Sequence, residues 1–442
     1  VHRHFIQNYW KTPMKAKVQT VQPITASMWL LAFALSTPIL LLPFSRAFIA
    51  PLGILAVLGL FMLIGLLRHR GTFNSDDKAL QVLPRIFLFI WLPMLISLID
   101  AEYPKQVLKA VQLYPLYTLM ALAVIVILRA KNVLKPLAII ISWIVCIWAF
   151  DGVAQAALGI DMFNIPLDRA GVDSAKANAF FTSPNKYGFY MGMMAATPLF
   201  TMYLCGVNRL THILVSLLLM ASVLIGASRG GWVMFACAFV IYVYLVFIKP
   251  AKRPLVPILV IPSLIAVVFM IALQFGTGMQ ERMSRFNGLL EKVDYQTLNI
   301  ALSGRVDIYQ AAWEIGKQHP VNGVGVDSFD KVYLSYLPQN NMWQTMIVDA
   351  PPHPHQVMLE IWSGAGSIGI IGFLLAWLAM WRLWQQALPE QRKLALPVLM
   401  PLFVLWWPLN THRGFYPSEL AILTLFFVAL SIAALTSRSD YQ

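Results

Sequence analysis

The sequence predicts an all-α polytopic membrane protein with about twelve transmembrane helices and one large polar loop before the tenth. Its 442 residues are 59% hydrophobic and only 12% charged, which is about half the charged fraction of a soluble domain. Apolar runs of about 20 residues recur along the chain, and this is the length that crosses a bilayer as a helix. Because a large soluble protein needs no such repeated runs, we exclude that class.

The expected spans follow one another with short connections as far as residue 273, and three more follow residue 355. In order they cover residues 26–44, 47–67, 80–99, 105–128, 133–157, 186–205, 210–227, 230–248, 254–273, 356–381, 394–410 and 416–436. We therefore divide the chain into helices one to nine (1–273), an external loop domain (274–355) and helices ten to twelve (356–442).

Lys and Arg predict the orientation of these spans. The net charge of +13 would suggest nucleic acid in a soluble protein, but here the basic residues lie in short loops between apolar runs. One set of loops, with both chain ends, carries most of them: Arg3, Lys11, Lys15, Lys17, Arg68, Arg70, Lys78, Arg129, Lys131, Lys135, Arg209, Lys249, Lys252, Arg253, Arg382, Arg392, Lys393 and Arg438. The opposite loops carry few. We expect cytoplasmic termini and a long loop outside, in the periplasm of a Gram-negative cell.

Three arginines lie at external turns in short polar motifs. Arg229 belongs to Ser-Arg-Gly-Gly, Arg305 to Ser-Gly-Arg near the start of an amphipathic helix, and Arg413 to the last external turn. An arginine fork at a helix start matches a pair of phosphate oxygens, so several converging arginines would hold a pyrophosphate. For any one of them alone, interfacial snorkelling or a local ion pair is the simpler interpretation.

A second external segment, residues 158–186, contains Asp161, Asp168 and Asp173. These acids do not form an Asp-x-Asp pattern, which argues against a Mg²⁺-dependent sugar-nucleotide enzyme. The simplest interpretation of the segment is a solvated loop that ends in a helix cap. The three cysteines lie in or beside apolar spans and show neither a disulfide framework nor a zinc spacing.

Two histidines lie where the long loop meets the tenth span, in Pro352-His-Pro-His-Gln356. The prolines restrict the backbone, so a histidine held here could serve as a general base. His353 and His355 would share one face of an extended strand, but no third metal ligand stands at a recognisable spacing, so we expect no metal. Glu360, one turn past Gln356, must face protein or water.

Gly366, Gly369 and Gly372 recur at every third residue in the tenth span. We interpret this spacing as close helix packing.

His355-Gln356, followed after nine residues by Gly366-x-x-Gly369, resembles the signature of the bacterial O-antigen ligase and polymerase superfamily. The upstream Ser-Arg-Gly-Gly and Ser-Gly-Arg motifs and the large loop before the tenth span strengthen the resemblance. It implies a GT-C-like glycosyltransferase of the bacterial inner membrane that faces the periplasm. Its donor would be undecaprenyl-pyrophosphate-linked O-antigen and its acceptor lipid A–core, with no cofactor and no metal.

By position in these motifs, His355 would be the general base on the acceptor hydroxyl. Arg229 and Arg305 would bind the pyrophosphate and stabilise its developing charge, and the reaction would invert the anomeric centre. We expect Arg413, His353 and Gln356 to add to substrate binding.

Two alternatives within the superfamily are O-antigen polymerase and protein O-oligosaccharyltransferase, which differ in the acceptor. Outside it, a lipid-linked oligosaccharide transporter would place ionisable groups at the bilayer midplane, whereas here they gather at the outer boundary. The glycan, the acceptor sugar and the oligomeric state do not follow from the sequence.

Overall fold

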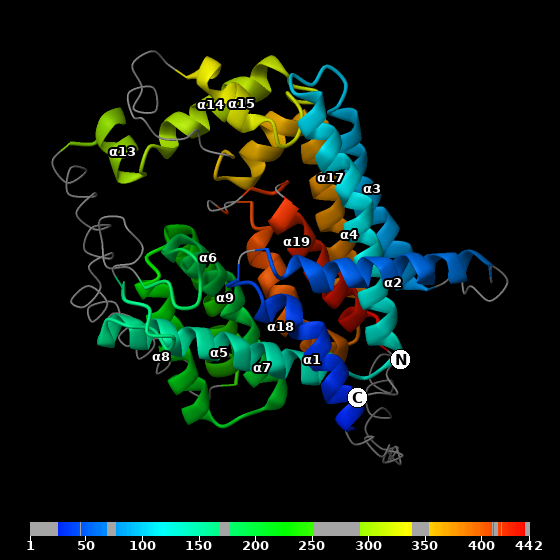
Figure 1. The fold of residues 1–442 in the computed structure, drawn as a ribbon, viewed down its shortest axis with the longest axis vertical. Helices are drawn as coiled ribbons and strands as arrows, with labels where there is room; N and C mark the ends of the chain where they lie inside the picture. Colours follow the sequence, from blue (N-terminus) through cyan, green and yellow to red (C-terminus); the bar gives the residue numbers. More distant parts are fainter. Residues whose placement is uncertain are drawn as a thin grey trace, which may run out of the picture.

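The computed structural model describes residues 25–44, 46–68, 77–167, 177–250, 292–337, 353–408, 410, 414–416 and 418–437. These residues form helices and no strand (Figure 1). The helices are α1 (Ala26–Leu40), α2 (Ile49–Arg68), α3 (Lys78–Ile96), α4 (Pro104–Ala130), α5 (Leu134–Leu158), α6 (Pro184–Met194), α7 (Ala196–Cys205), α8 (Arg209–Ile225), α9 (Arg229–Val243) with its π-helical continuation η4 (Tyr244–Ile248), α13 (Tyr295–Ala301), α14 (Arg305–Gln318), α15 (Phe329–Val332), the 3₁₀ turn η5 (Tyr333–Tyr336), α17 (Val357–Gln386), α18 (Pro389–Leu405) and α19 (Ser418–Leu435).

The prediction of an all-α fold is confirmed for the described residues, and several of the helices have the length and composition of membrane spans. Every expected span within the described residues coincides with a helix, or with two consecutive helices where residues 186–205 divide at Ala195 into α6 and α7. Within the part of the chain that the structure describes, six helices are long and apolar enough to cross a membrane: α2, α3, α4, α5, α9 with η4, and α17. The expected span 254–273 lies outside the described residues, so the count of twelve and the external side of the long loop stay predictions.

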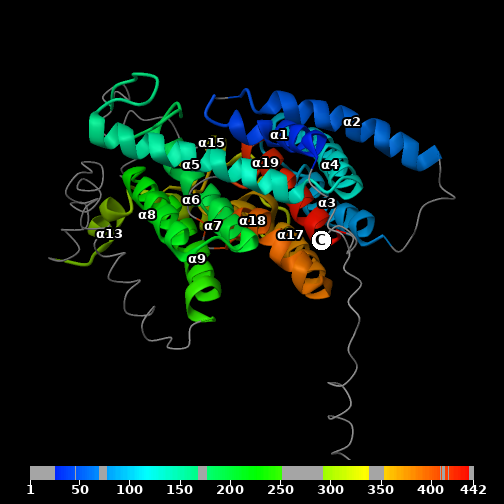
Figure 2. The same cartoon turned by 90° about the horizontal axis from the view of Figure 1, so that it is seen from below.

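The exposed surface of these helices is apolar in the way that lipid-facing surfaces are. Phe61 is 66% exposed, and Trp143 and Val240 are each 68% exposed. α19, in contrast, is apolar around its whole circumference and is buried from Leu420 to Leu435, against α4 and α18. It therefore forms the centre of the bundle, while α5 lies across α7 and α8 at one side (Figure 2).

The helices of the polar loop, α13 to α15, gather at one end of the molecule (Figure 1). A small core of their own includes Ile308, Ile315, Phe329 and Tyr333. Leu359 of α17 also packs against this core. The loop domain is therefore fixed directly to the first turns of α17.

α17 is broken at Gly366, whose backbone angles of φ 60° and ψ −156° are open to glycine and strained for other residues. The break would leave two amides and two carbonyls without their helical partners. The segment 320–325, which follows α14, supplies all four partners. The bonds are Ser367 N to Pro320 O (2.9 Å), Ile368 N to Val321 O (3.2 Å), Val324 N to Ser363 O (2.9 Å) and Gly325 N to Gly364 O (3.1 Å).

The interpretation of the three glycines as packing residues is therefore correct only in part. At Gly372 an added Cβ would lie 2.0 Å from the Phe89 carbonyl oxygen of α3, as close helix packing requires. At Gly366 the glycine is needed for the backbone break, and a Cβ there would lie 2.4 Å from the Val321 carbonyl group.

Candidate active site

Arg229 is the first residue of α9, and the local sequence fixes it there. The Ser228 side chain caps the helix by accepting a hydrogen bond from the Gly231 amide at 3.2 Å. α9 packs tightly on α6, since an added Cβ on Gly192 would lie 2.3 Å from Gly231 Cα. The Ser-Arg-Gly-Gly motif thus combines a helix cap, a cation and a close helix contact.

The structure brings the first two arginine motifs together. The Arg229 guanidinium donates to the Ala301 carbonyl oxygen and, at 3.1 Å, to the Ser303 hydroxyl. Ser303 lies two residues before Arg305, in the turn between α13 and α14. Segments more than 70 residues apart in the sequence are therefore joined by one side chain.

The turn that presents Arg305 is held by buried polar groups. Ser303 and Gly304 both have positive φ, at 56° and 74°. Asn299 accepts from the Val306 amide at 3.1 Å and donates to the Asp307 carboxylate at 2.8 Å. Asp307 is only 2% exposed. These bonds fix the direction in which α14 leaves the turn.

Arg305 is the first residue of α14 and lies beside Tyr309. Burial raises the pKa of the Tyr309 hydroxyl, and the positive charge and hydrogen bond of Arg305 oppose that rise. The phenol is therefore neutral at ordinary pH and places no negative charge beside the guanidinium.

α14 and α17 pack side by side and run in the same direction. The Trp313 and Trp362 rings are 5.9 Å apart, and further along the chain Ser367 bonds Pro320. Arg305 precedes Trp313 by eight residues and Gln356 precedes Trp362 by six, which is about 12 and 9 Å along their helices. Both helix starts therefore lie on the same side of the tryptophan pair.

The histidine segment ends in a left-handed turn, in contrast to the extended strand that the prolines suggest. His355 has φ of 55°, a conformation that is uncommon for a residue other than glycine. The His353 and His355 rings still meet, with centroids 4.3 Å apart and planes at 62°. The prolines restrict His353, which stands before Pro354, but Gln356 follows His355 and imposes no such restriction.

Gln356 caps α17 and connects it to the end of α18. Its side-chain carbonyl accepts from the Leu359 amide, and its amide donates to the Pro408 carbonyl oxygen. The Val357 amide adds a bond to the Asn410 carbonyl oxygen at 3.3 Å. The position of His355 thus depends on the residues that follow α18.

Glu360 is 5% exposed and faces protein, as expected for an ionisable residue in this helix. Its carboxylate accepts hydrogen bonds from the Phe415 amide at 2.5 Å and from the Tyr416 amide at 3.1 Å. It therefore ties the last external turn to the first turns of α17.

A second carboxyl group, Asp327, lies close enough to Glu360 for its charge to act on it. Burial and the neighbouring Asp330 raise the pKa of Asp327 to about 6, against the opposing charge of Lys109. No sequence pattern pointed to this residue, because it is an aspartate in a loop that belongs to no motif.

The second external segment is more buried than a solvated loop. Phe181 is 2% exposed and its ring lies 5.1 Å from that of Trp148. The Gln155 side chain accepts from the amides of Asn178 and Ala179, each at 2.9 Å. The expected helix cap is present, since Ser183 accepts from the Lys186 amide. The solvated interpretation is thus wrong for Ala177, Ala179 and Phe181, which are buried, whereas Thr182 is exposed.

Several predicted residues lie outside the described part of the chain. The site candidate Arg413 is one of them, and so are Asp168 and Asp173 of the second external segment. Within the described residues, no group of three or more His, Cys, Asp or Glu side chains is placed to hold a metal ion.

Comparison with known proteins gives two findings. Residues 214–374 match the family model described as O-antigen ligase, and this range includes Arg229, Arg305, His355 and the Gly366 break. An uncharacterized protein of Haemophilus influenzae is 22% identical over 402 residues, covering 87% of this chain and 86% of that protein. The family match over residues 214–374 supports the O-antigen ligase superfamily.

Proposed function

We propose that the protein is an O-antigen ligase, an inverting and metal-independent glycosyltransferase of the inner membrane. It would move O-antigen polysaccharide from undecaprenyl pyrophosphate to lipid A–core at the periplasmic face. The observation that carries this proposal is the contact of Arg229 with Ser303, which joins two cationic motifs at the starts of α9 and α14. The family match over residues 214–374 supports the same class of substrate.

The two arginines suit a pyrophosphate leaving group. Arg229 and Arg305 each stand at a helix N-terminus, where the backbone dipole favours negative charge. Two guanidinium groups on separate rigid helices could stabilise the charge that develops as the glycosyl–phosphate bond breaks. We expect Arg413 to add a third cation at the last external turn.

His355 supplies the base in this proposal. It would take the proton from the acceptor hydroxyl as the oxygen attacks the anomeric carbon and the pyrophosphate leaves from the opposite side. One such displacement inverts the anomeric centre. The shared direction of α14 and α17 supports the placement of His355 near Arg305, and the His353 ring orients the base. Since the donor brings its own leaving group, no nucleotide or metal is needed.

The test is transfer of O-antigen by the purified protein in proteoliposomes with lipid-linked donor and lipid A–core. His355→Ala should lower transfer by about 10²–10⁴-fold while donor binding is retained. Arg305→Ala should weaken donor binding. His319→Ala is the matched control, because His319 is another loop histidine, bonded to Tyr336 at 3.3 Å, with no role in the proposal. Full transfer by His355→Ala would refute the assignment of the base, and loss of activity in excess EDTA would refute the metal-independent reaction.

Lipopolysaccharide from a deletion strain separates ligase from polymerase. A ligase defect removes every O-chain, including single repeats, whereas a polymerase defect leaves single repeats attached. Protein glycosylation that is lost while the lipopolysaccharide stays intact would indicate the third member of the superfamily, the protein O-oligosaccharyltransferase.

A further inference from the structure

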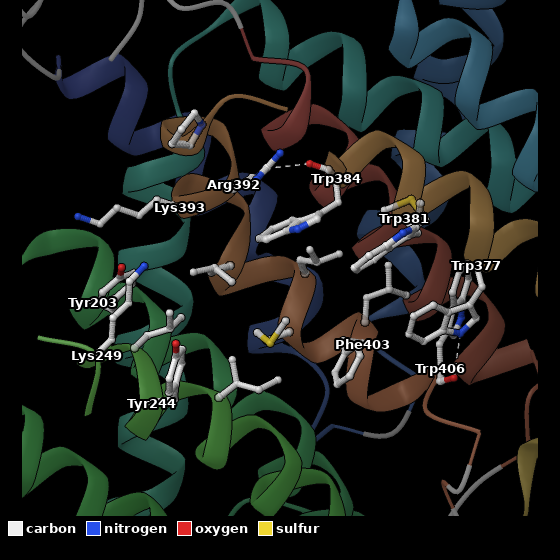
Figure 3. Close-up of a pocket in the computed structure, with 18 residues that line it drawn as sticks. Tyr203, Tyr244, Lys249, Trp377, Trp381, Trp384, Arg392, Lys393, Phe403 and Trp406 are labelled. Carbon is white, nitrogen blue, oxygen red and sulfur yellow. Dashed lines mark hydrogen bonds between the residues drawn. The ribbon is translucent and has the colours of Figure 1, made fainter. Parts of the chain in front are cut away.

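A cavity lies far from the histidine segment, between α7, η4, α17 and α18 (Figure 3). Its volume is about 590 Å³. The part of α17 that lines the cavity runs from Trp377 to Trp384. Trp377 follows Gln356 by 21 residues, which is about 30 Å measured along the helix. It is therefore separate from the candidate active site.

Most of the cavity wall is apolar and aromatic. The wall includes Trp377, Trp381, Leu399, Phe403 and Trp406. On α18 the lining residues run from Pro389 to Phe403, and the part from the cation Lys393 to Phe403 rises about 15 Å. This is about half the hydrocarbon thickness of a bilayer, so the groove has the depth of one leaflet.

Three cations gather at one end of the groove: Lys249, Arg392 and Lys393 (Figure 3). The Arg392 guanidinium donates to the Trp384 and Gln385 carbonyl oxygens at 2.9 and 2.7 Å, which holds it at the end of α17. Among the described residues that line the groove, none is acidic. The cations therefore make the groove attractive to an anion at this end only.

An apolar channel of one leaflet's depth with cations at its mouth matches the two parts of a phospholipid. We propose that the groove binds an acidic phospholipid, with an acyl chain along the tryptophan wall and the phosphate at Lys249, Arg392 and Lys393. Basic pockets between transmembrane helices bind anionic headgroups in this way. The orientation predicted from Lys and Arg places the cations in the cytoplasmic leaflet. The proposal is independent of the glycosyltransferase function, because it uses none of the residues assigned to the reaction.

Native mass spectrometry of the full-length protein in detergent tests the proposal, with phosphatidylglycerol and phosphatidylcholine of identical acyl chains as probes. We expect phosphatidylglycerol to bind about a hundredfold more tightly, since each of the three cations contributes about fivefold. The double variant Lys249→Ala/Lys393→Ala should lose this preference by up to about 30-fold. Lys131→Ala/Lys135→Ala is the control, because it removes two exposed basic residues near the start of α5 that do not line the groove.

Leu399→Trp tests the apolar wall separately, since it should reduce binding of both lipids and leave the cations intact. A photoreactive residue at position 399 then identifies the occupant. Labelled lipid supports the proposal, whereas a crosslink to residues 254–273 or to a second copy would overturn it. Equal binding of the two lipids by the unmodified protein, or the same loss in both lysine pairs, would overturn it as well.

Discussion

Gly366→Ala should separate the loop that follows α14 from the break in α17. The alanine methyl group would lie 2.4 Å from the Val321 carbonyl group, and the backbone at this position has φ of 60°. Neither problem can be relieved by a side-chain rotation, since both involve backbone atoms. The loop must move away from the break, or the break must straighten and lose its four bonds to residues 320–325.

The size of the effect follows from these two costs. Forcing a residue with a Cβ into this conformation costs about 1–3 kcal/mol. Each of the four hydrogen bonds contributes about 1 kcal/mol to stability. We therefore expect a loss of about 2 kcal/mol if the loop shifts but keeps its bonds, about 4 kcal/mol if the break straightens and the four bonds are lost, and about 6 kcal/mol if the loop detaches while the break remains.

Hydrogen exchange of the amides in residues 320–326, together with thermal unfolding in detergent, measures this loss. Gly364→Ala is the matched control, because it adds the same methyl group two residues earlier, where the nearest heavy atom, Val326 Cα, would be 3.3 Å away. The control should exchange nearly as slowly as the unmodified protein. If Gly366→Ala shows the same protection and melting temperature as Gly364→Ala, the account of the break is refuted.

Two further predictions concern the loop domain, and a third concerns its contact with α9. Asp327→Asn should stabilise the protein increasingly as pH rises from 4 to 8, by up to about 3 kcal/mol. The folded-state pKa of Asp327, about 6, lies above the ordinary value of 3.8, so the stability that the protonated carboxyl contributes is lost as pH rises through 6. If the difference in unfolding free energy between the variant and the unmodified protein does not change with pH, the prediction is contradicted. Asn299→Ala should cost about 2–3 kcal/mol, because it leaves buried groups of the turn before Arg305 without partners; unfolding within about 0.5 kcal/mol of the unmodified protein would count against it. Arg229→Lys should reduce donor binding although the charge is kept, since a lysine cannot make the forked contact with Ala301 and Ser303, and unchanged binding in a titration with lipid-linked donor would show that the fork is dispensable.

The helices of the membrane part could be predicted from the sequence, because the length of an apolar run has a direct physical meaning in a bilayer. The expected span 105–128 and the helix α4 (Pro104–Ala130) differ by one residue at the start and two at the end. The break in α17 could not be predicted in the same way. Gly366 and Gly372 look alike in the sequence, and only the backbone angles show that the first one interrupts the helix.

The candidate site was predictable as a set of residue types but not as an arrangement. The positions of Arg229 and Arg305 at helix starts followed from the surrounding Ser and Gly residues. The connection of the two arginine motifs through Ser303 did not follow from the sequence, because it depends on how α13 meets α9. Asp327 was missed because its neighbour Glu360 is distant in the sequence, and no spacing rule joins a loop residue to a helix 33 positions later.

The hydrogen bonds of Glu360 also have a consequence for biosynthesis. The amides that hold this carboxylate belong to Phe415 and Tyr416, which leave the ribosome 55 and 56 residues after it. Because chains mature from the N-terminal end, α17, which follows His355, is made before these amides exist. The turn before α19 therefore completes the surroundings of Glu360, and a nascent chain that stops before Phe415 would carry Arg229, Arg305 and His355 without these two hydrogen bonds.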